Sequence, residues 1–146
     1  MEIAIREIEL ADADEVSQLV AQLGYERSPA EIREWTEALR REHRQQAAFA
    51  AVLGGEILGW VEISVERRLQ SPPFALIGGL VVKNSMRNRG IGRQLCARAE
   101  AWAWERSLDK VRVTSRSTRA DAHRFYLRDG YREVKTSMVF EKNRPR

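Results

Sequence analysis

With 146 residues the chain is long enough to bury a hydrophobic core as one domain, without disulfides or a structural metal. Its one cysteine, Cys96, excludes an intramolecular disulfide, and the two histidines are too isolated to build a metal centre. No stretch approaches the roughly 20 apolar residues of a membrane span, and the N-terminus lacks the basic start and apolar run of a signal peptide. We therefore expect one soluble, cytoplasmic domain over residues 1–146, with no metal and no membrane contact.

The net charge of +4 combines an acidic first part with a basic second part. Residues 1–82 contain 8 Lys and Arg against 14 Asp and Glu, a net charge of −6. Residues 83–146 contain 17 against 7, a net charge of +10. This split favours an anionic partner for the second part and a cationic partner for the first, although a dipolar surface that serves only solubility has the same signature. A basic half also suits nucleic acid, so the motifs must decide.

The chain is expected to begin with a strand and two helices. Apolar residues alternate over 3–10, which predicts the strand. Asp12 followed by Glu15 has the spacing of a capping box and predicts a helix that runs to the next glycine. Residues 28–31 (SPAE) place Ser at the N-cap, Pro at the first helical position and Glu at the third, which predicts a second helix that fades into the charged run at 40–44.

Three strands are expected in the middle of the chain. Residues 47–53 and 56–66 read as strands joined by Gly54-Gly55, a two-residue hairpin signal. Residues 67–73 are expected to form a loop, because they contain two consecutive prolines. The apolar run at 74–82 predicts a strand buried on both faces.

The second half is expected to continue with a long helix over about 90–107 and a short strand at 110–115. A further helix is capped near Thr118 and ended by Gly130, and residues 131–142 supply one or two closing strands. This order of elements predicts a mixed α/β sandwich around a central β–α–β unit.

The segment at 82–93 (VKNSMRNRGIGR) carries the strongest chemical signal. A buried strand runs into a turn whose glycines, Gly90 and Gly92, open a helix, so that backbone N–H groups without intrahelical acceptors converge there. The positive charges around this turn come from Arg87, Arg89 and Arg93. The pattern predicts a polyphosphate site, with a tight turn that needs small residues for packing as the alternative. Its spacing fits neither a nucleoside-triphosphate P-loop nor a GxGxxG dinucleotide fold.

Here the sequence resembles the GNAT superfamily of N-acetyltransferases. The acetyl-CoA signature of the family, (Q/R)xxGx(G/A), is matched at every fixed position by residues 87–92. Leu80-Val81-Val82 resembles the strand whose backbone pairs with the pantetheine arm. Residues 122–126 (AHRFY), followed by Gly130-Tyr131, resemble the AxxFYxxxGF segment of the family. The resemblance extends over residues 3–142.

The resemblance implies an α/β (α+β) fold with a mixed, mostly antiparallel central sheet flanked by helices. The fourth and fifth strands, 74–82 and 110–115, would splay apart and admit acetyl-CoA. The amides of the loop would hold the pyrophosphate, and the strand would hold the pantetheine. Arg119 stands where many members have an asparagine near the cofactor. The implied cofactor-binding residues are Leu80, Val81, Val82, Arg87, Asn88, Arg89, Gly90, Ile91, Gly92, Arg93 and Arg119.

In this family a neutral amine attacks the thioester directly, and a thiolate leaves. Tyr126 matches the tyrosine that often protonates the thiolate, although it could instead pack in the core beside Phe125. Leu76 stands where some members carry a glutamate base, so Glu62 is the catalytic candidate in its place, with Glu66 the next nearest. A solvated strand charge, or an enzyme with no dedicated base, remains the alternative.

The expected function is therefore acetyl transfer from acetyl-CoA to an amine, with an acyl-CoA-binding regulatory module without turnover as the alternative. No nucleic-acid-binding motif is present. The acidic first half favours a cationic small-molecule or peptide amine as acceptor. Trp102 and Trp104 cannot both face the core from one helix, so one is exposed or covered in a homodimer. The candidate acceptor contacts are Glu26, Glu31, Glu34, Glu62 and Glu66.

Overall fold

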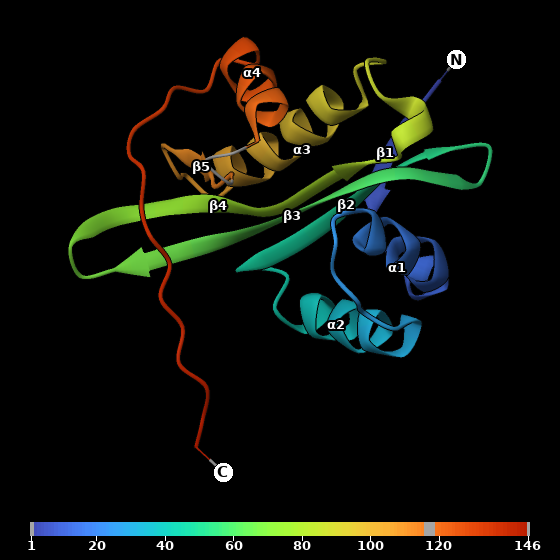
Figure 1. Ribbon diagram of the computed structural model, residues 1–146, viewed down its shortest axis with the longest axis horizontal. Helices are drawn as coiled ribbons and strands as arrows, with labels where there is room; N and C mark the ends of the chain where they lie inside the picture. The colour runs from blue at the N-terminus through green and yellow to red at the C-terminus, as the bar shows by residue number, and fades with distance from the viewer. Residues whose placement is uncertain (1, 116–118, 146) are drawn as a thin grey trace. The chain divides into compact units, whose positions relative to one another are not determined.

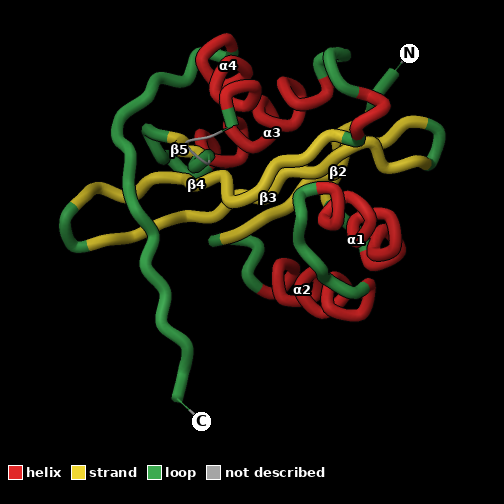
Figure 2. Tube along the Cα trace, in the orientation of Figure 1, coloured by secondary structure: helices red, strands yellow, loops and turns green. Residues whose placement is uncertain are grey.

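The computed structural model describes residues 2–115 and 119–145 and divides into two units, Met1–Thr114 and Ser115–Arg146, which are described separately. The first unit contains a five-stranded sheet in the order β1-β2-β3-β4-β5. The first four strands pair antiparallel, and β4 and β5 pair in parallel (Figures 1 and 2). The strands are β1 (Ala4–Glu7), β2 (Gln46–Leu53), β3 (Glu56–Arg68), β4 (Ser71–Val82) and β5 (Val111–Val113).

Helices cover both faces of this sheet. The helices α1 (Ala13–Gln22) and α2 (Pro29–Arg41) lie on one face, and α3 (Ile91–Glu105) lies on the other (Figure 1). On the α1–α2 face the buried side chains form one apolar cluster around Trp60. On the α3 face Leu95 packs against β3 at Gly59, where an added Cβ would approach the Val81 carbonyl oxygen to 2.6 Å. The mixed, mostly antiparallel sheet flanked by helices confirms the predicted fold class.

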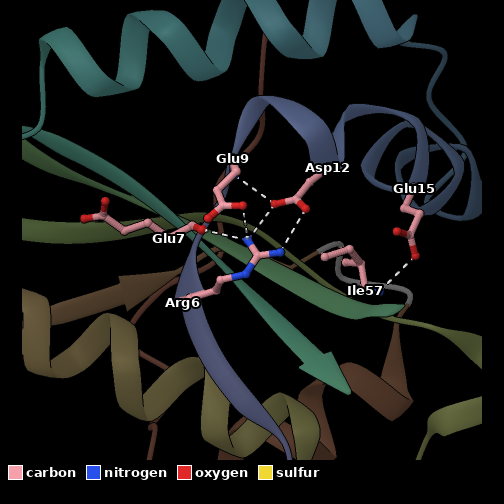
Figure 3. A network of polar contacts seen from close by, with 6 residues as sticks. All are labelled: Arg6, Glu7, Glu9, Asp12, Glu15 and Ile57. Atoms are coloured by element: carbon pink, nitrogen blue, oxygen red, sulfur yellow. Dashed lines mark hydrogen bonds and ion pairs between the residues drawn. The ribbon is translucent and has the colours of Figure 1, made fainter. Parts of the chain in front are cut away.

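Asp12 is the N-cap of α1, which confirms the predicted start, but the capping box predicted between Asp12 and Glu15 is not formed. The predicted start of α2 is confirmed together with its capping box. A 3-10 turn at Leu10–Asp12 precedes α1, and its capping box joins Glu9 to Asp12 rather than Asp12 to Glu15 (Figure 3). Glu15 is used elsewhere, because its carboxylate accepts a hydrogen bond from the Ile57 N–H at 2.9 Å. At α2 the Ser28 and Glu31 side chains make the reciprocal bonds of a capping box, as the spacing predicts.

The predicted loop at 67–73 is also wrong, because β3 and β4 extend to within two residues of each other. Arg68 pairs with Ser71, and the register then shifts before Glu66 pairs with Phe74. The two prolines occupy this irregular end of the ladder, where the missing N–H groups cost no regular hydrogen bond. The hairpin predicted at Gly54-Gly55 is confirmed, with both glycines at positive φ (57° and 83°).

The second unit contains one helix, α4 (Ala120–Arg128), among its described residues. Gly130, at φ 94°, follows this helix as predicted, whereas Thr118 lies outside the described residues. The predicted closing strands at 131–142 are wrong: residues 131–145 hold no strand (Figure 2). Apolar, β-prone residues are present, but Val134, Met138, Val139 and Phe140 are all exposed. A strand needs a hydrogen-bonded neighbour, and no second extended segment pairs with this one in the described part of the unit.

Candidate cofactor and catalytic site

The parallel pairing between β4 and the edge strand β5 is short. In the part of the chain that the structure describes, Ala75–Ile77 of β4 pair with Val111–Val113 of β5, and β4 then continues to Val82 past the end of β5. Within the described residues, positions 79–82 of β4 therefore pair with β3 alone. The splay of the two strands that the resemblance implies remains a prediction.

The hydrogen-bond phase of β4 determines which of its backbone groups point away from β3. The Lys83 N–H donates to the Leu58 carbonyl at 2.8 Å, so these two residues form a hydrogen-bonded pair. Because hydrogen-bonded and non-bonded pairs alternate in an antiparallel ladder, Val82 and Leu80 turn their N–H and C=O groups away from β3. Val81 turns its backbone groups toward β3 and buries its side chain at 4% exposure. The backbone groups of Leu80 and Val82 are therefore not used in the ladder with β3.

A β-bulge interrupts β4 where it leaves β5. Glu62 of β3 pairs with Gly79, and the next residue, Ile63, pairs with Ile77, so Gly78 is an extra residue. The ring of Trp60 packs over Gly79, where an added Cβ would lie 2.7 Å from it. Bulges bend the strand that carries them, and this one directly follows the residues of β4 that pair with β5.

The glycine-rich loop follows β4 through a 3-10 turn at Asn84–Met86. Asn88 adopts φ 64°, and Gly90, at φ 78°, is the N-cap residue of α3 with no side-chain cap. Helix geometry leaves the N–H groups of Ile91 and Gly92 without intrahelical acceptors, and an added Cβ on Gly90 would meet nothing within 4 Å. The arginines Arg87, Arg89 and Arg93 are exposed around this turn. A polyphosphate group fits open space bordered by amides and guanidinium groups.

Glu62 is half-buried on the α1–α2 face and contacts Trp35 of α2, whose indole N–H donates to its carboxylate. Burial raises the pKa of the Glu62 carboxyl above its ordinary value, and the hydrogen bond from Trp35 offsets part of that rise. Glu66 accepts a hydrogen bond from Ser64 at 2.9 Å and pairs with Arg68 at 3.3 Å. The Glu66 carboxylate is thus paired with an arginine, whereas the Glu62 carboxylate accepts from an indole N–H.

Tyr126 and Arg119 lie in the second unit. Tyr126 is half-buried on α4, with the rings of Phe125 and Tyr131 edge-on at centroid distances of 5.2 and 5.8 Å. Arg119 is the exposed N-cap residue of α4. The other predicted site residues, from Glu62 through Arg93, all belong to the first unit.

Two side chains of the first unit have a role that sequence reasoning missed. Trp35 reads as a core or interface residue but is 43% exposed and holds Glu62. Gln22, the last residue of α1, bonds the backbone on both sides of Lys83, donating to the Val82 carbonyl at 2.8 Å and accepting from the Asn84 N–H at 2.9 Å. No sequence pattern identifies Gln22, because the contact joins residues 60 and more positions apart.

A shallow depression of about 300 Å³ borders Trp35 on α2. It is lined by Arg27, Glu31, Glu34, Trp35 and Arg41. Arg27 and Glu31 pair with each other at 2.9 Å, so the charge of Glu31 is already balanced. Within residues 2–115 and 119–145, no three His, Cys, Asp or Glu side chains are placed to hold a metal ion. In the same residues, no helix has the length and apolar character to cross a membrane.

Comparison with known proteins identifies the family. The model of the Acetyltransferase (GNAT) family matches residues 8–131, and the chain therefore belongs to this family. An aminoalkylphosphonate N-acetyltransferase of Salmonella typhimurium is 36% identical over 84 residues. That match covers 57% of this chain and 54% of the relative, so it spans about half the length of the curated relative.

Solved structures show the same fold. A transcriptional regulator from Bacillus halodurans superposes with a TM-score of 0.86 at 24% identity, over 97% of this chain and 100% of that one. AAC(6')-Iy in complex with the bisubstrate analog CoA-S-monomethyl-acetylneamine superposes with a TM-score of 0.85 at 18% identity, over 98% and 99%. At these identities the likeness concerns the fold.

Proposed function

We propose that this protein is an acetyl-CoA-dependent N-acetyltransferase that transfers the acetyl group directly to an amine acceptor. The observation that carries the proposal is the open, glycine-bordered N-terminus of α3, which follows β4 after a 3-10 turn and a short loop. Family membership and the amine acetylation named for the Salmonella relative support the same reaction class.

The residues of the first unit fit coenzyme A by their chemistry. The amides of Ile91 and Gly92 and the surrounding guanidinium groups would hold the pyrophosphate, because anions bind at helix N-termini. Leu80 and Val82 would offer backbone groups to the amide-containing pantetheine arm, as a strand does for its neighbour. When bound, acetyl-CoA supplies an activated thioester. Among the remaining cofactor contacts, Asn88 would shape the loop through its positive φ.

Glu62 is proposed as the general base. A primary amine arrives protonated at neutral pH and must lose a proton before it attacks. A carboxylate whose pKa is raised by burial is a better proton acceptor than an exposed one, and Trp35 fixes its orientation. Tyr126 is proposed as the acid that protonates the leaving thiolate, a role that rests on the family motif.

The acceptor is proposed to be a cationic small-molecule or peptide amine. The named relative acts on an amine, and residues 1–82 carry a net charge of −6. Glu31 and Glu66 are paired with arginines, so the acidic contacts left for a cation are Glu26, Glu34 and Glu62. A carboxylate both attracts an ammonium and takes its proton, which is why Glu62 connects recognition with catalysis.

Gly90→Asp tests the cofactor site. The substitution brings a carboxylate and a Cβ to a positive-φ position in front of the amides, so we expect acetyl-CoA affinity to fall by about 100-fold or more. Gly54→Asp is the matched control, because it introduces the same residue at a positive-φ glycine in a hairpin. Isothermal calorimetry on both folded variants measures the effect. Unchanged affinity in Gly90→Asp would show that the loop does not hold the pyrophosphate.

A regulatory module that binds acyl-CoA without turnover is the second candidate. Leu76, which stands where some family members carry a glutamate base, is the observation in its favour. Thiol release from acetyl-CoA across an amine panel separates the two, since a module without turnover releases none with any acceptor.

A homodimer is proposed on the exposure of Trp104. Trp102 is buried and Trp104 is 51% exposed on the same helix, as the spacing of the two residues requires. Light scattering of the wild type and Trp104→Ser checks the proposal, with a monomeric wild type as the contrary result.

A further inference from the structure

Both polar atoms of the Gln22 side-chain amide make hydrogen bonds to the backbone, at the point where the glycine-rich loop leaves the sheet. Its Nε2 donates to the carbonyl of Val82, the last residue of β4, at 2.8 Å. Its Oε1 accepts from the N–H of Asn84, the first residue of the 3-10 turn, at 2.9 Å. One side chain from the end of α1 therefore bridges the two peptide groups that flank Lys83.

Lys83 itself is held from the other side. Its N–H donates to the Leu58 carbonyl at 2.8 Å, and its ammonium pairs with the Glu56 carboxylate at the start of β3. Its carbonyl accepts from the Met86 N–H at 2.8 Å, which closes the first turn of the loop. The junction between β4 and the loop is thus held on two sides. Lys83 is bonded to β3, and its neighbours Val82 and Asn84 are bonded to Gln22 of α1.

This fixation bears on the proposed cofactor site. Val82 turns its backbone groups away from β3, and the bond from Gln22 fixes the plane of the peptide that joins Val82 to Lys83. The bond to Asn84 fixes the direction in which the next residues depart toward Gly90. Since amides bind a phosphate only when they converge on it, the exit direction of the chain controls how well the loop binds.

The docking of α1 does not need Gln22. Val16, Leu19 and Val20 bury the apolar face of the helix, at 4%, 6% and 8% exposure. Beside Gln22 lies a small polar cavity of about 140 Å³, lined also by Glu15, Gln18, Leu19, Ile57 and Lys83. The Gln22 amide spans from the helix to the loop junction at the edge of this cavity, rather than filling the core.

We propose that Gln22 is a positioning residue that presets the glycine-rich loop for the pyrophosphate of acetyl-CoA. The inference rests on the proposed function, because it assigns Gln22 a part in the same cofactor site. It predicts that removal of the amide weakens cofactor binding without slowing the chemical step.

The test compares Gln22→Met, which keeps the length of the side chain and removes both hydrogen bonds, with Gln22→Glu, which keeps only the acceptor for Asn84. Gln18→Met is the matched control, since Gln18 is an exposed residue one turn earlier that lines the same cavity. Calorimetry with acetyl-CoA, steady-state kinetics, thermal unfolding and amide hydrogen exchange are measured on all three.

For Gln22→Met we expect acetyl-CoA affinity and the KM for acetyl-CoA to weaken by about 3- to 10-fold, the loss expected for one or two net hydrogen bonds. The kcat should stay within about twofold, and the Asn84 amide should lose protection while Gln94 in α3 keeps it. Gln22→Glu should weaken affinity at least as much as Gln22→Met, because its second carboxylate oxygen faces the Val82 carbonyl oxygen without a proton between them. Gln18→Met should match the wild type.

Three results would overturn the inference: unchanged affinity in Gln22→Met, a fall in kcat with KM unchanged, or a loss of more than about 5 °C in Tm, which would mean that the amide stabilises the fold as a whole. A wild type that does not bind acetyl-CoA would instead overturn the proposed function. The two failures are therefore distinguishable.

Discussion

At the scale of single residues, the most deeply buried charge in the first unit is Asp12, at 5% exposure. Arg6 of β1 donates to both of its oxygens, at 2.7 and 2.9 Å, and the Glu9 N–H adds a third bond at 2.8 Å (Figure 3). Burial alone would raise the pKa of the Asp12 carboxyl, but these bonds outweigh it and hold the pKa below the ordinary value. Asp12 therefore ties β1 to the start of α1 as a carboxylate.

The lowered pKa of Asp12 makes the stability of the fold depend on pH in a definite direction. A group whose pKa is lower in the folded state stabilises the fold above its unfolded pKa, and this contribution is lost as pH falls through the folded value. We expect Asp12→Asn to cost about 2 kcal/mol at pH 7, as for a hydrogen bond to a charged group. The difference in unfolding free energy between Asp12→Asn and the wild type should become smaller below about pH 4. Urea denaturation at pH 7 and pH 3 measures it, with the exposed Asp14→Asn as control, and a pH-independent difference would contradict the assignment.

The pKa of Glu62 is shifted upward, in the opposite direction to that of Asp12, and this shift leads to a prediction for catalysis. If it is the base, the acidic limb of kcat/KM should lie above the ordinary glutamate pKa, because burial raises it. Trp35→Phe removes the hydrogen bond that favours the charged form, so the limb should move to still higher pH. Glu62→Gln should lower kcat/KM by about 100-fold or more and abolish this limb.

Glu66→Gln serves as the control for Glu62→Gln, since Glu66 is paired with Arg68 on the same strand. The thermal stability of Glu62→Gln should also show whether Glu62 serves catalysis or the fold. Because a buried carboxylate is penalised in its charged form, Glu62→Gln should leave Tm unchanged or raised at pH 7. An acidic limb that persists in Glu62→Gln would assign the base to another group.

At the scale of elements, the bulge in β4 depends on two adjacent glycines with different surroundings. A Cβ on Gly79 would lie 2.7 and 2.8 Å from two ring atoms of Trp60, which is itself 8% exposed and cannot move freely. A Cβ on Gly78 would meet nothing within 4 Å. We expect Gly79→Ala to cost about 1–3 kcal/mol by overpacking and Gly78→Ala about 0.5 kcal/mol or less. Chemical denaturation of the pair checks this, and equal costs would show that the ring yields.

Local signals predicted the elements whose causes are local. The capping box at Ser28 and the hairpin at Gly54-Gly55 depend on neighbouring residues only, and both are confirmed. The capping box predicted between Asp12 and Glu15 is not formed, because the Asp12 carboxylate accepts hydrogen bonds from Arg6 and from the Glu9 N–H instead. The two prolines of residues 67–73 wrongly predicted a loop, because an irregularity in the β3–β4 ladder accommodates them within a strand. Contacts between distant elements, such as Trp35 with Glu62, leave no periodic trace in the sequence.

At the scale of the whole molecule, the family match runs over residues 8–131 and thus includes parts of both units. The single domain over residues 1–146, the role of Tyr126 and the contact of Arg119 remain predictions. The AxxFYxxxGF resemblance that supports them lies in the second unit, whereas the loop and Glu62 lie in the first. Tyr126→Phe is expected to lower kcat by about 100-fold with acetyl-CoA binding nearly intact, if this tyrosine is the acid. An unchanged kcat in a steady-state assay would make Tyr126 structural.

The asymmetry of charge leads to a last prediction, about salt. The net charge of −6 over residues 1–82 should attract a cationic acceptor, and the +10 over residues 83–146 should attract the phosphates of acetyl-CoA. Raising the salt concentration from about 0.05 to 0.5 M shortens the Debye length, so the KM for both substrates should rise. The KM for a neutral amine should hardly change. Glu34→Gln, in the depression beside Trp35, should raise the KM for the cationic acceptor alone, while Glu105→Gln on α3 should not. An acceptor screen at the two salt concentrations decides the matter, and a preference for neutral or acidic amines would refute cation recognition.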